Sequence, residues 1–176
     1  MRYLGIWLAV FIMATAVSDA RGKEGRKMAD MKLGSPAFVD NGAIPAQYTC
    51  DGRDVNPPLL IENVPAAARS LALIVDDPDA PAGMWVHWVV WNIDPKSVEI
   101  GENSVPPGAA QGKNDWRRNS YGGPCPPSGA HRYFFKLYAL DTSLSLGAGT
   151  TKADLEKAMQ GHVIAQAQLI GIYKRR

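Results

Sequence analysis

The chain has 176 residues, of which 46% are hydrophobic, 19 are Lys or Arg and 17 are Asp or Glu, and its formal net charge is +2. This length suits one compact domain with a sizeable core. The nearly balanced charge, without a basic stripe, argues against a nucleic-acid-binding protein.

The N-terminus has the layout of a secretory signal peptide. Met1-Arg2 precedes an uncharged, largely apolar run to Val17, and Ser18-Asp19-Ala20 supplies small residues at the cleavage spacing. The run is short for a membrane span, which needs about 20 residues, although an uncleaved anchor stays an alternative. We therefore predict a periplasmic or secreted protein with a signal peptide at 1–20, a basic flexible segment at 21–32 and one folded domain at 33–176.

Runs with β-strand character dominate the rest of the chain. Residues 71–75 form an apolar run that an Asp-Pro turn ends, and residues 85–93 alternate between two bulky faces, so both predict buried strands. Strict alternation places His87 with Val89 and Trp91 on one face. The runs at 131–140 and 163–173 also alternate and predict two further strands. The set of side chains expected on the His131 face is Tyr133, Phe135 and Leu137, with Phe134, Lys136 and Tyr138 opposite.

One helix is indicated by its start and stop residues. Thr151 and Asp154 have the spacing of a capping box, and Gly161 is a suitable stop. The stretch at 94–123 has prolines, glycines and little periodicity, which predicts a long loop. The expected fold class is therefore mostly β, a sandwich with one or two short helices.

Two turn-rich segments, far apart in the chain, each open into a predicted strand and deliver a histidine. Asp76-Asp77-Pro78-Asp79-Ala80-Pro81 precedes Trp85 and His87, and Gly122-Gly123-Pro124 precedes His131. Three acids exceed what a turn requires, and glycine lets the backbone approach a ligand closely. Histidines and free backbone N–H groups suit phosphate or carboxylate oxygens. We therefore predict a small anion-binding pocket at one end of the sheet.

Other interpretations of these residues stay open. A histidine between two tryptophans, as at His87, also fits a core residue with one hydrogen bond. Two His with two Asp could ligate zinc, but no closely paired spacing such as His-x-x-x-His occurs. A hydrolase is disfavoured because there is no Gly-x-Ser-x-Gly motif. The cluster at 116–118, Trp-Arg-Arg, either borders the pocket or is an ordinary surface feature, and we favour the second interpretation. His162 is interpreted as structural.

The two cysteines of an exported chain favour a disulfide. We predict a Cys50–Cys125 bond, and two separate free thiols are the alternative. The enclosed loop is long, so its closure is expected to stabilise the domain by several kcal/mol on the chain-entropy model.

These motifs together resemble the signature of the phosphatidylethanolamine-binding proteins (PEBPs), in particular the bacterial and archaeal YbhB/YbcL-type Raf kinase inhibitor-like proteins. The resemblance extends over roughly residues 33–173. It rests on residues 77–81, 85–88 and 129–133, and also on 50–52, 56–58, 111–115, 121–127 and 167–173. It implies a β-sandwich of antiparallel or mixed sheets with one pocket for phosphate-type head groups. The ligand-binding residues that it implies are Asp77, Asp79, Pro81, Trp85, His87, Gly123, His131 and Tyr133.

The leading hypothesis is an exported, non-enzymatic binding protein for a small ligand that bears phosphate or carboxylate, such as a phospholipid head group, without cofactor or metal. The histidines and the glycine N–H groups would donate to the anion, and the protein could modulate a partner such as a kinase or protease. The alternative is an inhibitor of a kinase or protease that acts through surface loops. A metal-dependent hydrolase is less favoured. Peripheral contact with membrane lipid and a homodimer are left open.

Overall fold

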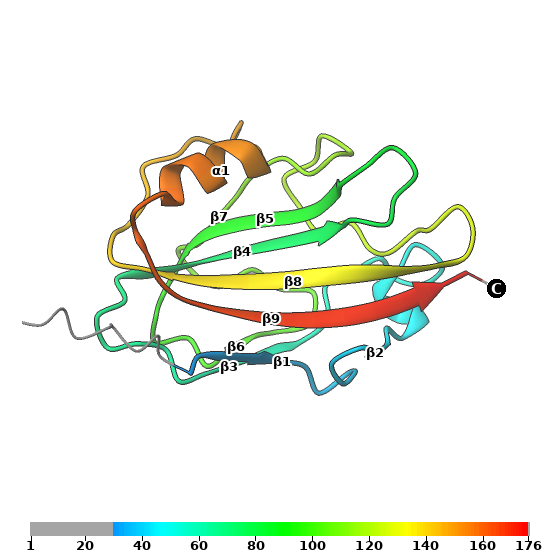
Figure 1. Cartoon of the computed structure of the whole chain (residues 1–176), viewed down its shortest axis with the longest axis horizontal. Coiled ribbons are helices and arrows are strands. Elements are labelled where there is room, and N and C mark those ends of the chain that lie inside the picture. Colours follow the sequence, from blue (N-terminus) through cyan, green and yellow to red (C-terminus); the bar gives the residue numbers. More distant parts are fainter. Residues whose placement is uncertain (1–29, 176) are drawn as a thin grey trace, which may run out of the picture.

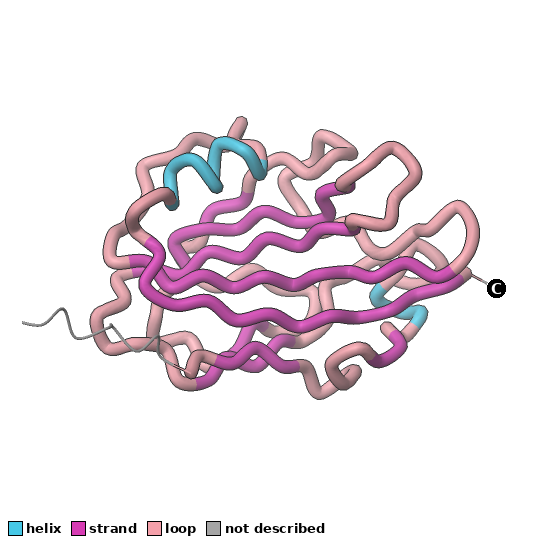
Figure 2. Tube along the Cα trace, viewed as in Figure 1, coloured by secondary structure: helices cyan, strands magenta, loops and turns pink. Residues whose placement is uncertain are grey.

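The computed structural model describes residues 30–175, so the predicted signal peptide and most of the predicted basic segment lie outside the described residues. Strands and loops make up most of this part of the chain (Figure 2). Its strands are β1 (Lys32–Gly34), β2 (Gly42–Ala43), β3 (Leu59–Glu62), β4 (Ser70–Asp77), β5 (Trp85–Ile93), β6 (Glu99–Ile100), β7 (Ala110–Gln111), β8 (Ala130–Leu140) and β9 (Val163–Lys174). Its helices are a 3₁₀ turn, η1 (Ala46–Tyr48), and one α-helix, α1 (Lys152–Met159).

The strands form two sheets. One has six strands in the order β2-β9-β8-β4-β5-β7, and the other has three in the order β1-β3-β6 (Figure 1). Strands β4, β5, β8 and β9 pair antiparallel, whereas β2 pairs parallel with β9. The expected sandwich of antiparallel and mixed sheets with few helices is confirmed.

Two apolar clusters cover opposite faces of the large sheet. The first fills the space between the sheets, where Leu59 and Ile61 of β3 join Leu73, Phe135 and Leu137 of the large sheet. The second lies under α1 and has as members Ala72, Ile74, Val86, Val89, Trp91, Leu140, Leu144, Leu155 and Met159. Strands β4 and β5 are therefore buried on both faces, as their bulky side chains predicted.

The helix begins at the predicted capping box. Thr151 Oγ1 accepts a hydrogen bond from Asp154 N at 3.3 Å, and Asp154 Oδ2 accepts one from Thr151 N at 2.9 Å. The loop predicted at 94–123 is less irregular than expected, because β6 and β7 lie within it. Among residues 30–175, no helix is long and apolar enough to cross a membrane.

The predicted disulfide is confirmed. Cys50 and Cys125 are bonded, their Cα atoms lie 5.4 Å apart, and 75 positions of sequence separate them. Both residues are exposed. The bond joins the chain just after η1 to the loop before β8, and it is compatible with a location outside the cytoplasm.

Candidate functional site

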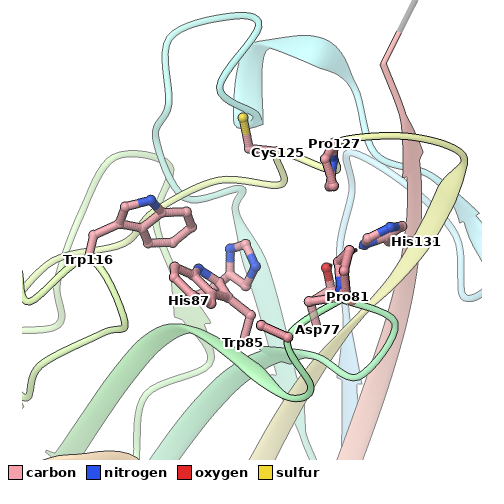
Figure 3. Close-up of a pocket in the computed structure, with 10 residues that line it drawn as sticks. Asp77, Pro81, Trp85, His87, Trp116, Cys125, Pro127 and His131 are labelled. Atoms are coloured by element: carbon pink, nitrogen blue, oxygen red, sulfur yellow. Dashed lines mark hydrogen bonds and ion pairs between the residues drawn. The ribbon is translucent and has the colours of Figure 1, made fainter.

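A cavity of about 310 Å³ lies at the end of the large sheet where β4 ends and β5 and β8 begin. In Figure 3, Trp116 and His87 lie on one side, His131, Asp77 and Pro81 lie on the other, and Cys125 and Pro127 belong to the loop above them. The full lining consists of Asp77, Ala80, Pro81, Ala82, Trp85, His87, Trp116, Cys125, Pro127 and His131. Five of the residues predicted to bind a ligand are therefore brought to one cavity, namely Asp77, Pro81, Trp85, His87 and His131.

A β-bulge directs His87 toward this cavity. Val75 pairs with Trp88 and Asp76 pairs with Val86, so His87 is an extra residue without a partner on β4. The strict alternation predicted for β5 is wrong here, because His87 shares the Tyr133 face with its neighbour Trp88, whereas Val89 and Trp91 lie on the α1 side. Bulges commonly redirect a side chain beside a functional site.

The ring of His87 is fixed by its backbone partner and by two aromatic neighbours. Its Nδ1 lies 2.6 Å from Gly122 O, and Gly122 N donates in return to His87 O at 3.0 Å. The ring lies edge-on between Trp116 and Tyr133, at centroid distances of 5.0 and 5.1 Å. Burial lowers the pKa of His87, although the Gly122 carbonyl and the carboxylate of Asp77 act in the opposite direction.

The three acids of the first motif have three different partners. Asp77 is buried; its Oδ2 lies 2.8 Å from His131 Nδ1, and its Oδ1 accepts a hydrogen bond from Asp79 N at 2.8 Å. Asp79 does not line the cavity. It accepts hydrogen bonds from the Arg132 guanidinium at 2.7 and 2.8 Å, which lower the pKa of Asp79 to about 2. Asp79 therefore fixes the start of β8, and Asp77 orients His131.

The third acid, Asp76, faces away from the cavity. Its carboxylate is fully buried and lies 2.8 Å from Lys136 Nζ and 2.7 Å from Lys152 Nζ. Lys136 belongs to β8 and Lys152 is the first residue of α1. Asp76 therefore joins the helix to the sheet and has no contact with the pocket.

Gly123 does not have the role that the resemblance implied. Its N–H donates to Asp54 Oδ1 at 2.6 Å, so it is not available to an anion, and Gly123 does not line the cavity. A Cβ at this position would lie 2.6 Å from Tyr48 O and 2.8 Å from Thr49 Cα. Glycine is therefore required here for close packing of the loop against the chain after η1.

The predicted site residue Tyr133 lies behind the cavity, against His87. Its hydroxyl is buried, and although Asp77 and the backbone of Cys125 lie near enough to act on it, neither makes a hydrogen bond of ordinary geometry to it. Burial, and after it the carboxylate of Asp77, raises the pKa of Tyr133. An unpaired buried hydroxyl costs about 1–3 kcal/mol.

We expect Tyr133→Phe to raise the free energy of unfolding by about 1 kcal/mol, because it removes that unpaired hydroxyl. Tyr121→Phe is the matched control, since the buried Tyr121 hydroxyl donates to Tyr48 O at 3.0 Å and its removal should lower the same free energy by about 1 kcal/mol. Urea unfolding of both variants measures the difference. Equal losses in the two variants would show that the Tyr133 hydroxyl has a favourable partner.

Sequence reasoning missed one major wall of the cavity. Trp116 was favoured as an ordinary surface residue, and this interpretation is wrong, because its ring lines the cavity and packs edge-on against Trp85 at 5.4 Å. A Cβ at Gly122 would lie 2.6 Å from the Trp116 ring. Because glycine has no side chain, Gly122 leaves room for the Trp116 ring at this position. The interpretation of His162 as structural agrees with its position, exposed and 2.8 Å from Asp141 Oδ1.

The walls of the cavity contain few polar groups. Its lining includes no lysine or arginine, and its titratable side chains are Asp77, His87 and His131. Within the part of the chain that the structure describes, no three His, Cys, Asp or Glu residues are close enough to hold a metal ion.

Comparisons with known proteins converge on one family. A family model described as phosphatidylethanolamine-binding protein matches residues 34–174. A UPF0098 protein of Methanothermobacter thermautotrophicus is 54% identical over 150 residues, which are 82% of this chain and 99% of that protein. The crystal structure of a PEBP homolog from Chlamydia trachomatis has a TM-score of 0.80 at 44% identity and covers 83% of this chain and 98% of its own. Escherichia coli YbcL, described as a new member of the mammalian PEBP family, has a TM-score of 0.79 at 29% identity, with coverage of 84% and 100%.

Proposed function

The chain belongs to the phosphatidylethanolamine-binding protein family, and we propose that it is a non-enzymatic protein whose pocket binds the phosphate or carboxylate group of a small ligand. A volume of about 310 Å³ is at the lower end of the range of small-molecule sites, which is about 300–1,000 Å³. The lining is also typical of such sites, since aromatic and apolar walls surround a few polar groups.

One observation supports the proposal most strongly. His87 of β5 and His131 of β8 line one cavity, and the Nδ1 atom of each ring is already held by a protein oxygen. Each ring is therefore fixed in orientation, and its Nε2 atom is the one left for a ligand. Asp77 acts through His131 as a positioning residue.

We further propose that the protein works outside the cytoplasm. The Cys50–Cys125 disulfide supports this location, since such bonds persist mainly in oxidising compartments. Fractionation of cells that express the full chain, followed by mass spectrometry of its N-terminus, tests both export and removal of the leader. Recovery of the uncleaved chain in the cytoplasm would reject this part of the proposal.

We expect His87→Gln and His131→Gln each to weaken binding of O-phosphoethanolamine roughly tenfold to hundredfold, because a hydrogen bond to a charged group contributes about 1.5–3 kcal/mol. Isothermal titration calorimetry at pH 7 measures the affinities, and circular dichroism confirms that the variants are folded. His162→Gln is the matched control, because His162 also pairs with an aspartate at 2.8 Å but lies outside the pocket. Parent-like affinity in both pocket variants would contradict the assignment.

A further inference from the structure

The hydrogen bonds of the two pocket histidines determine which ring nitrogen carries the proton. Gly122 O is a carbonyl oxygen, which only accepts, so His87 Nδ1 at 2.6 Å must donate to it. Asp77 Oδ2 likewise accepts from His131 Nδ1 at 2.8 Å. A neutral imidazole has a single N–H. In the neutral state, both Nε2 atoms are therefore hydrogen-bond acceptors.

The groups around His87 leave it neutral near pH 7. The charged groups that act on it are Asp76 and Asp77 of β4 and Asp115 of the loop after β7. The rings of Tyr133 and Trp116 cover it. The carboxylates favour the imidazolium, but burial is the larger effect and lowers the pKa of His87.

His131 has different neighbours, which include the remaining charged groups near the pocket. Asp77 at the end of β4 and Asp79 in the turn after it approach His131. Arg132 follows it on β8, and Tyr173 is its partner on β9. Because no lysine or arginine lines the cavity, no permanent positive charge is available there to a fully deprotonated anion.

The cavity has no fixed cation, and its donors are the indole N–H groups of Trp85 and Trp116, which can serve any anion. An anion that meets the accepting Nε2 of neutral His87 is therefore bound more tightly when a proton enters with it. We propose that this pocket takes up about one proton with its ligand and is selective for phosphate monoesters over sulfate esters of the same shape. The proposal rests on the proposed anion-binding function and narrows the class of ligand.

The second ionisation of a phosphate monoester has a pKa of about 6, so this group can supply the proton that fills an Nε2 lone pair. The same hydrogen bond forms when the proton is taken from water onto the imidazole and the dianion binds. In both cases one N···H···O contact is made and the complex holds one proton more than the separate dianion and neutral pocket. A sulfate ester has no titratable proton near neutral pH, so its contact with Nε2 forms only when the imidazole itself is protonated.

The test compares O-phosphoethanolamine with ethanolamine O-sulfate, which differ in the titratable proton of the anionic group. Calorimetry of the parent protein at pH 8, in two buffers of different ionisation enthalpy, measures protons taken up per ligand. We expect the phosphate compound to bind with uptake of about one proton. Its affinity should fall about tenfold per pH unit from pH 7 to 9. The sulfate compound should bind at least tenfold more weakly. His162→Gln should reproduce all three results, since that imidazole lies outside the pocket.

The outcomes separate this inference from the function on which it rests. Equal affinity for the two compounds, or heats that are identical in both buffers, would overturn proton-coupled selection and leave anion binding intact. Lack of binding by either compound at any pH from 5 to 9 would overturn the proposed function and this inference together.

Discussion

Replacing Cys50 and Cys125 together by serine is expected to lower the free energy of unfolding by about 4 kcal/mol. The disulfide spans 75 positions of sequence, and a crosslink over such a distance removes much of the conformational freedom of the unfolded chain. Urea unfolding of the parent and the double variant measures the loss. The parent treated with reductant should match the variant, since the chain has two cysteines and both are exposed.

The affinity of the pocket should change much less than the stability, although Cys125 lines the cavity. Three hydrogen bonds hold the loop before β8 independently of the disulfide. Gly123 N donates to Asp54 Oδ1, and the Tyr121 hydroxyl donates to Tyr48 O. The backbone N of Cys50 donates to Pro124 O at 3.1 Å. We expect a change of less than tenfold in the dissociation constant of O-phosphoethanolamine while the variant is folded. A loss of stability below about 1 kcal/mol would contradict the entropic account of this bond.

The large sheet shows what hydrophobic periodicity predicts and where it fails. The alternation of β8 was predicted correctly, because Tyr133, Phe135 and Leu137 are buried and Lys136 lies on the opposite face. The alternation of β5 was not, because a bulge at His87 inserts one residue. The local sequence does not predict this bulge, because the bulge depends on the register of β5 with β4.

The candidate site was predicted only in part, because it too depends on contacts between residues far apart in the sequence. The acids after residue 75 were correctly seen to exceed the needs of a turn. Their separate tasks could not be assigned, because Asp77 pairs with His131, 54 positions away, and Asp76 pairs with Lys152, 76 positions away. Such pairs follow from strand order and helix position. Trp116 was missed because a loop without periodicity does not show where its side chains lie.

The largest electrostatic effect on stability is expected on the face opposite the pocket. Asp76→Asn should lower the free energy of unfolding by about 3 kcal/mol, because breaking a buried ion pair leaves a charge without compensation. Here two ammonium groups, those of Lys136 and Lys152, would remain beside each other with side-chain exposures of 24% and 16%. Urea unfolding at pH 7 measures the loss.

Asp79→Asn is the matched control, since it makes the same substitution three positions away in a partly exposed ion pair with Arg132, and such pairs contribute little. The triple variant Asp76→Leu, Lys136→Met, Lys152→Met should recover most of the loss, because apolar side chains of similar volume often replace a buried ion pair without cost. If Asp76→Asn and Asp79→Asn proved equally stable, the buried carboxylate would not hold α1 on the sheet. The apolar contacts of Leu155 and Met159 alone would then account for the position of the helix.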